Sequence, residues 1–162
     1  MPITDRELLE RLLLPTDDAD GWRRRVAALA RDQAIPFAAG VLDDPLRPPR
    51  EREQAATMLG VLDGPGAVAP LARALDDPDP VLRARAIEAL GAAGDPGDEV
   101  VERILRALED PDSYVRETAA LTLGQLGVGR AVPALREMAE GSDELTLREA
   151  AAASLQRLGE EA

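Results

Sequence analysis

The residues with most chemistry to offer are aspartates and arginines that recur at nearly fixed spacing. Asp44, Asp77 and Asp110 each precede a proline and lie 33 residues apart. A series of arginines follows them at intervals of 31, 33 and 32 residues: Arg52, Arg83, Arg116 and Arg148. Carboxylates can transfer protons, and guanidinium groups bind carboxylates or phosphates through paired hydrogen bonds. Such a row could bind a charged ligand, or it could hold the fold together.

The composition excludes the commonest catalytic and metal-binding groups. The chain of 162 residues contains no Cys and no His, so the usual nucleophile, proton shuttle and zinc ligands are missing together. We therefore expect no catalytic residue, no cofactor and no metal site, and we predict that the protein is not an enzyme.

The net charge disfavours nucleic acid as a partner. It is −12, with 31 acidic and 19 basic residues, whereas binding to a phosphate backbone needs a positive field that releases counterions. The N-terminal stretch has acidic residues among its leucines and no long apolar run, so it predicts neither a signal peptide nor a membrane span. We expect a cytoplasmic protein.

The elements that carry the Asp and Arg columns repeat with them. Apolar residues at helical spacing predict a helix over residues 5–14 and a second one to about residue 32. Four further pairs follow, each with a short helix, an acidic turn and a longer Ala-rich helix. The short helices are predicted at 34–42, 67–75, 100–108 and 131–139, and the long ones at 48–61, 80–92, 113–126 and 143–158.

Several polar residues predict where these helices begin. Thr4 and Glu7 form a capping-box pattern for the first helix. Asp79, Asp112 and Ser142 are expected to cap later helices, and Pro80 suits the first helical position.

These patterns predict an all-α fold, an α-solenoid of about five helix pairs in one domain. The repeats span about 4–32, 34–61, 66–92, 98–126 and 130–158. With aromatic residues at only 2%, the core must be built from aliphatic side chains, and each should contribute about 2 kcal/mol by burial. The expected core residues are Leu59, Leu71, Leu75, Leu90, Ile104, Leu108, Leu123, Leu135 and Leu155.

The runs DPDPVLRARAIEALG and DPDSYVRETAALTLGQLG resemble the HEAT family, in particular the short bacterial HEAT-like repeats of phycobilisome lyases. The resemblance implies that the turn Asp caps backbone amides and forms a ladder with the Arg of the second helix. The implied ladder consists of Asp44, Asp77 and Asp110 with Arg23, Arg52, Arg83, Arg116 and Arg148. Gly141 and Ser142 replace the Asp-Pro pair in the last repeat, so that rung departs from the pattern. We favour this structural interpretation of the charged row over a catalytic one, because each Asp lies where a cap is needed.

The second helices of HEAT-like solenoids line the concave surface, and the positions opposite their buried face are offered to a partner. This stripe mixes exposed aromatic and aliphatic groups with Arg, Gln and Thr, which is the composition of a contact surface. The candidate partner-binding residues are Arg50, Gln54, Val81, Arg85, Glu88, Tyr114, Thr118, Leu121 and Gln125. Alternatively, Tyr114 and Leu121 pack against a neighbouring repeat.

Two irregular stretches stand outside the columns. Trp22, followed by three arginines, could close one end of the core or form an anion-binding corner. The turn Arg47-Pro48-Pro49-Arg50 is two residues longer than its neighbours and could be a tolerated insertion or a ligand contact.

The function predicted from the sequence is that of a noncatalytic scaffold or adaptor that binds a protein or peptide on its concave face. The chain is expected to be a monomer or a weak homo-oligomer. The first alternative is a subunit of a chromophore-lyase-type or other modifying enzyme, and the second is nucleic-acid binding.

Overall fold

The chain folds into a stack of helices that follows the predicted repeats. The computed structural model describes residues 5–62 and 64–160 and, within them, ten α-helices and two short 3-10 helices. The α-helices are α1 (Asp5–Leu12), α2 (Ala19–Ala27), α3 (Arg31–Asp43), α4 (Pro49–Leu62), α5 (Pro65–Ala74), α6 (Pro80–Ala92), α7 (Asp98–Arg106), α8 (Ser113–Gln125), α9 (Val132–Gly141) and α10 (Leu145–Arg157). The 3-10 helices, η1 (Ala107–Glu109) and η2 (Gly129–Ala131), follow α7 and precede α9.

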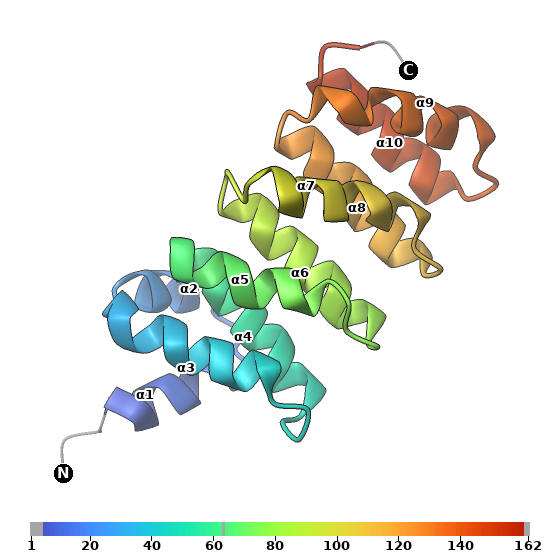
Figure 1. The fold of residues 1–162 in the computed structure, drawn as a ribbon. Helices are drawn as coiled ribbons and strands as arrows, with labels where there is room; N and C mark the ends of the chain where they lie inside the picture. The colour runs from blue at the N-terminus through green and yellow to red at the C-terminus, as the bar shows by residue number, and fades with distance from the viewer. Residues whose placement is uncertain (1–4, 63, 161–162) are drawn as a thin grey trace.

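The helices form two layers that rise together from α1 at one end to α10 at the other (Figure 1). Helices α4, α6, α8 and α10 pack against one another in sequence and form the second layer. Helices α3, α5, α7 and α9 cover one side of it. We call the opposite, solvent-facing side of the second layer the second-helix face. It corresponds to the surface that the sequence predicts as concave and partner-binding.

Some predicted helix boundaries differ from the structure. The predicted second helix to residue 32 is wrong, because α2 ends at Ala27 and α3 already begins at Arg31. The predicted start at residue 143 is also wrong, since α10 begins at Leu145 and Ser142 is not its N-cap. The Ser142 hydroxyl instead accepts a hydrogen bond from the Glu144 amide at 3.2 Å, which satisfies a turn donor rather than a helix donor. The predicted capping box rests on Thr4, which lies outside the described residues.

Other predicted caps are confirmed. The Asp79 carboxylate accepts a hydrogen bond from the Val81 amide at 2.9 Å, and Pro80 occupies the first turn of α6. Asp112 accepts hydrogen bonds from the amides of Tyr114 and Val115 at the start of α8. Each cap satisfies a donor that a helix N-terminus leaves without an intrahelical partner.

The core is a continuous strip of aliphatic side chains between the two layers. Leu59, Leu90, Leu123 and Leu155, one from each second helix, are fully buried. Of the predicted core residues only Leu75 is not buried. It is the C-cap of α5 and lies half-buried at the margin of the core, because the helix ends one residue before it.

Three glycines allow the second helices to approach one another closely. A Cβ atom added at Gly60, Gly91 or Gly124 would lie within 3.0 Å of the next second helix. At Gly124 it would lie 2.6 Å from the Cβ of Ser154 and 2.8 Å from its Cα. The buried Ser154 hydroxyl donates to the Ala120 carbonyl at 2.8 Å across the same interface. These contacts fix the spacing of the helices that carry the second-helix face.

The Asp and Arg columns form a ladder in the central repeats. Arg83 donates to both carboxylate oxygens of Asp110, at 2.9 and 2.7 Å, and to the Asp77 carbonyl at 2.9 Å. Arg52 pairs with Asp77 at 2.6 Å. The Arg83 and Asp110 side chains are only 14% and 12% exposed, so water screens this rung weakly. The structural role implied for these residues is therefore confirmed.

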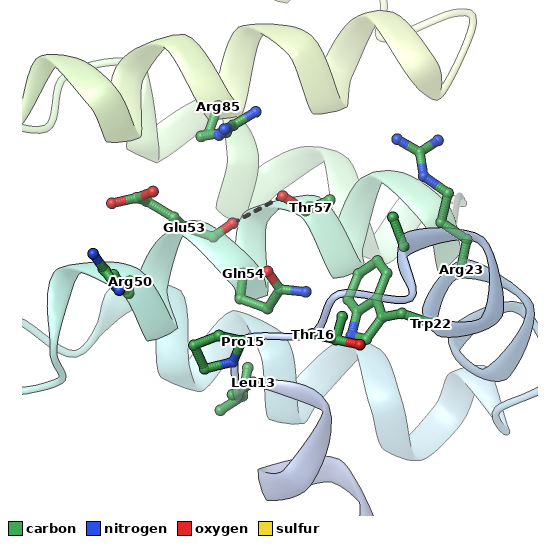
Figure 2. Close-up of a pocket in the computed structure, with 11 residues that line it drawn as sticks. Leu13, Pro15, Thr16, Trp22, Arg23, Arg50, Glu53, Gln54, Thr57 and Arg85 are labelled. Carbon is green, nitrogen blue, oxygen red and sulfur yellow. Dashed lines mark hydrogen bonds between the residues drawn. The ribbon is translucent and has the colours of Figure 1, made fainter.

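The ladder changes at both ends. Arg116 pairs with Glu144 at 2.7 Å, so a glutamate supplies the rung that the missing Asp-Pro pair would have supplied. The implied contribution of Arg23 is wrong, because Arg23 is exposed and forms no ion pair with Asp44. Asp44 keeps only its turn role and accepts a hydrogen bond from the Leu46 amide at 2.9 Å. Arg23 points toward the second-helix face instead (Figure 2).

Candidate functional site

A hollow of about 380 Å³ lies on the second-helix face near the N-terminal end of the stack (Figure 2). Its walls come from the loop after α1, from α2, from α4 and from one residue of α6. We call it the N-terminal hollow. Its lining residues are Leu13, Pro15, Thr16, Ala19, Trp22, Arg23, Arg50, Glu53, Gln54, Thr57 and Arg85.

The apolar part of the hollow is held in place by local hydrogen bonds. Leu13 and Trp22 are 3% and 4% exposed and belong to the core. The Trp22 indole Nε1 donates to the Leu12 carbonyl at 2.8 Å, which ties α2 to the end of α1. Asp18 caps α2 by accepting from the Gly21 amide at 2.8 Å. The prediction that Trp22 closes the end of the core is confirmed, and the same side chain lines the hollow.

Three guanidinium groups lie around the hollow. Arg23 and Arg50 are exposed, and neither has a carboxylate partner among the residues described. Arg85 pairs with Glu88 at 2.8 Å, but both side chains are well exposed, at 39% and 59%. Burial lowers the pKa of Arg85, but the hydrogen bond that it donates to Glu88 and the attraction of nearby acidic groups together raise that pKa above its ordinary value. Guanidinium groups stay protonated in proteins, so these three side chains bring positive charge to the hollow.

Helix α4 adds polar groups on one wall. The Thr57 hydroxyl donates to the Glu53 carbonyl at 3.0 Å, so its oxygen remains able to accept a further hydrogen bond. The Gln54 side chain makes no hydrogen bond within the described part of the chain and can both donate and accept. Glu53 is the single carboxylate of the lining. The hollow thus offers an apolar floor with a polar, mostly cationic rim.

The lengthened turn before α4 positions this wall. Arg47 donates to both oxygens of Glu10 in α1, at 3.0 and 2.9 Å, and to Glu51 at 3.0 Å. The hydrogen bond from Arg47 is the main cause of the lowered pKa of Glu10. Pro49 then begins α4, and Arg50 follows it in the first turn. The two-residue insertion therefore anchors α1 and places Arg50 at the hollow.

The predicted partner-binding residues do not form one site. Arg50, Gln54 and Arg85 meet at the hollow, while Glu88 pairs with Arg85 beside it. The others lie farther along the second-helix face. Val81 and Tyr114 are 38% and 45% exposed, Thr118 donates to the Tyr114 carbonyl, Leu121 packs against the core, and Gln125 donates to the Gly91 carbonyl at 3.3 Å.

Sequence reasoning missed the wall formed by the loop after α1. Pro15 and Thr16 of that loop, like Ala19 at the start of α2, carry no repeat signature, and the resemblance places Arg23 in the ladder. The signal that could have found them is an interruption: this segment lacks the columns that the central repeats keep.

The described residues show no metal cluster and no membrane-spanning segment. No group of three or more Asp or Glu side chains among them is arranged to hold a metal ion. Across the same residues, no helix combines the length and the apolarity that crossing a bilayer requires.

The family follows from the repeats. A family model described as HEAT repeats matches residues 41–98 and 72–156, which together cover more than half of the chain. The chain belongs to the HEAT-repeat family. No curated protein matches this HEAT-repeat protein.

Solved structures share its fold at low sequence identity. One is human deoxyhypusine hydroxylase in complex with glycerol, with a TM-score of 0.67 and 24% identity over 83% of this chain and 46% of that one. Another is the complex of CpcE and CpcF of phycocyanin lyase from Nostoc sp. PCC7120, with a TM-score of 0.69 and 22% identity over 98% of this chain and 66% of that one. This HEAT-repeat protein thus spans less than two thirds of each. Likeness at this identity concerns the fold alone.

Proposed function

We propose that this HEAT-repeat protein is a noncatalytic scaffold that binds a protein or peptide on its second-helix face, centred on the N-terminal hollow. The observation that carries the proposal is the composition of the hollow. An apolar floor from Leu13 and Trp22 lies beside a rim with two guanidinium groups that pair with no carboxylate of the described residues. Aromatic and Arg side chains in one desolvated pocket are the usual centre of a protein interface.

The groups around the hollow suit binding more than chemistry. Arginine remains protonated throughout the physiological range, so it cannot serve as a general base. Glu53 is the only carboxylate of the lining, so the hollow holds no second carboxylate to act as its acid or base partner. A site without paired acid and base groups favours recognition.

The arrangement of the helices supports a rigid docking surface. The close contacts at Gly60, Gly91 and Gly124 fix the separation of consecutive second helices. A surface that is already ordered loses little conformational entropy when a partner binds. Val81 and Tyr114 extend the apolar contact area along the face beyond the hollow.

A role as a subunit of a modifying enzyme is the second candidate. The observation that favours it is the shared fold with the lyase complex of CpcE and CpcF, which extends over 98% of this chain at 22% sequence identity. In that role the second-helix face would still bind a protein, and the active site would form only in the assembly.

The test is affinity capture from a lysate of the source cells with the intact chain and with a Tyr114→Ala/Arg85→Glu variant. An Arg106→Glu variant, which alters an exposed residue of α7, serves as the matched control. Circular dichroism must first show that all three are equally helical. We expect one protein to be enriched by the intact chain and by the control but not by the double variant, and the purified pair to bind in calorimetry.

Equal capture by the double variant would contradict the proposal and direct attention to the first layer. If the captured complex catalyses a reaction that neither component catalyses alone, the enzyme-subunit role replaces the noncatalytic one.

A further inference from the structure

We propose that the N-terminal hollow recognises a carboxylate-rich peptide segment of the partner that carries one large apolar side chain among its acidic residues. This inference rests on the proposed scaffold function and specifies the chemistry of its ligand. It follows from a cationic rim, an apolar floor and the charge of the surrounding surface.

The first step is that the rim contains guanidinium groups which the fold does not use. Arg52 and Arg83 have side chains only 16% and 14% exposed and are paired with ladder aspartates. Arg23 and Arg50 are exposed instead, with no carboxylate partner in the described part of the chain. Two such groups facing one hollow can each form a paired hydrogen bond with an incoming carboxylate.

A third guanidinium can join them. Arg85 pairs with Glu88 within the same helix, and both ends of this pair are open to water. Exposed pairs of this kind contribute little to stability, so a ligand carboxylate can replace Glu88 at small cost. The Gln54 amide of α4, which makes no hydrogen bond with the residues described, adds a neutral donor to the hollow.

The second step concerns charge. The lining contains three arginines and one glutamate, whereas the whole chain has a net charge of −12. An acidic segment is therefore repelled by most of the surface and attracted by the hollow. Because the rest of the surface repels an acidic segment, such a segment should bind specifically at the hollow and not nonspecifically elsewhere.

The third step is the size and polarity of the floor. Leu13 and Trp22 form an apolar base, and the volume of about 380 Å³ lies at the lower end of the range of ligand pockets, roughly 300–1,000 Å³. A purely ionic ligand would leave this floor wet. One leucine-sized side chain placed on it would exclude water and strengthen the surrounding ion pairs.

The probe is a fluorescein-labelled heptapeptide, Asp-Glu-Glu-Leu-Glu-Asp-Glu, and its neutral counterpart is Asn-Gln-Gln-Leu-Gln-Asn-Gln. Binding to the full chain is measured by anisotropy, and unlabelled peptide is followed by the emission of Trp22, the only tryptophan. We expect the acidic peptide to bind at least about tenfold more tightly than the neutral one and to weaken as salt rises. We expect Trp22 emission to change on saturation.

Two double variants separate site from net charge. Arg23→Glu/Arg50→Glu alters the rim, and Arg106→Glu/Arg157→Glu alters two exposed arginines outside it, so both change the net charge by the same amount. We expect the rim variant to lose about tenfold or more in affinity and the control to stay within about twofold. Arg23→Gln/Arg50→Gln, which adds no negative charge, provides the same test if charge reversal disturbs folding.

The inference is overturned if the acidic peptide fails to bind at millimolar concentration, if the neutral peptide binds equally well, or if both charge variants lose the same affinity. The two experiments distinguish a failure of this inference from a failure of the scaffold proposal. Capture that depends on Tyr114 and Arg85 while the acidic peptide does not bind would retain the scaffold and reject its acidic ligand. Peptide binding at the hollow together with capture that ignores the second-helix face would do the reverse.

Discussion

The arginines of the column differ in burial and in pairing between the first repeat and the central repeats. In the centre, Arg83 is held by the Asp110 carboxylate and by the Asp77 carbonyl, and it is almost buried. Arg23 occupies the corresponding place in the first repeat, yet it is exposed and lines the N-terminal hollow. The same residue type in the same column holds the fold in one region and is available to a ligand in the other.

The turn between the two helices of the second repeat, which carries Asp44, accounts for the difference. Asp77 and Arg83 are six residues apart, as are Asp110 and Arg116, whereas Asp44 and Arg52 are eight apart. The two extra residues allow Arg47 to bind Glu10 and leave Asp44 with a turn contact only. The hollow therefore lies where the ladder is interrupted.

The largest difference between the regions should appear on removing apolar side chains. Leu123→Ala in the central stack deletes a fully buried side chain and should cost about 2–5 kcal/mol of unfolding free energy. Leu14→Ala in the first repeat removes a side chain that is 55% exposed and should change it by no more than about 0.5 kcal/mol. Urea unfolding measures both, and similar losses would mean that the Leu14 side chain packs into the core rather than facing solvent.

Glycine-to-alanine substitutions should change the unfolding free energy in opposite directions at the contacts between second helices and on the exposed side of the first layer. Gly124→Ala places a Cβ 2.8 Å from the Ser154 Cα, so it should destabilise by about 1–3 kcal/mol. Gly40 lies on the exposed side of α3, where an added Cβ would meet no side chain or neighbouring segment within 4 Å, so Gly40→Ala should stabilise by about 0.5–1 kcal/mol. Thermal and urea unfolding check the pair. Stabilisation by Gly124→Ala would show that the second helices can separate without loss.

Arginine removal tests the comparison itself. Arg83→Ala breaks a rung that is neither fully exposed nor fully buried, and it should cost about 1–2 kcal/mol, between the values for exposed and buried pairs. Arg23→Ala should leave the unfolding free energy unchanged, because no described carboxylate contacts it. Equal losses in chemical denaturation would refute the distinction between ladder and rim.

A smaller effect concerns pH. Burial raises the pKa of Asp110, but the hydrogen bonds that it accepts from Arg83 and from the Asp112 amide help to lower it by more. The pKa in the folded state is therefore below the ordinary value. The rung therefore contributes fully above about pH 4, the unfolded pKa, and is lost as pH falls through the folded pKa. Asp110→Asn should unfold more easily at pH 7 and show a smaller loss of stability between pH 7 and pH 3. An unchanged pH dependence would mean that Asp110 does not titrate differently on folding.

The sequence was sufficient for most of the fold, because columns of Leu, Ala, Asp and Arg report helix faces and turns directly. It located α6 and α8 within a residue at each end. It misplaced the end of α2, since the Ala-rich run after Val26 contains neither Gly nor Pro to stop a helix. The prediction misplaced the last turn, because Ser142 suggests a helix cap whereas Glu144 directly precedes α10 and pairs with Arg116.

The hollow was harder to predict. Arg50, Gln54 and Arg85 were expected on the partner-binding face and do line it. The residues that turn this face into a hollow come from the loop after α1, whose position depends on the hydrogen bond of Trp22 and the ion pair of Arg47 with Glu10. Contacts between segments so different in sequence have no repeat signature, so only the folded chain brings them together.

The most direct measurement is an NMR titration that follows the side-chain Nε–Hε signals of the arginines, assigned through single Arg→Lys variants, as the acidic heptapeptide is added. The distinction between rim and ladder predicts saturable shifts at Arg23, Arg50 and Arg85, with Arg52, Arg83 and Arg116 unchanged. Shifts at the ladder arginines without shifts at the rim, or uniform small shifts over all of them, would contradict it.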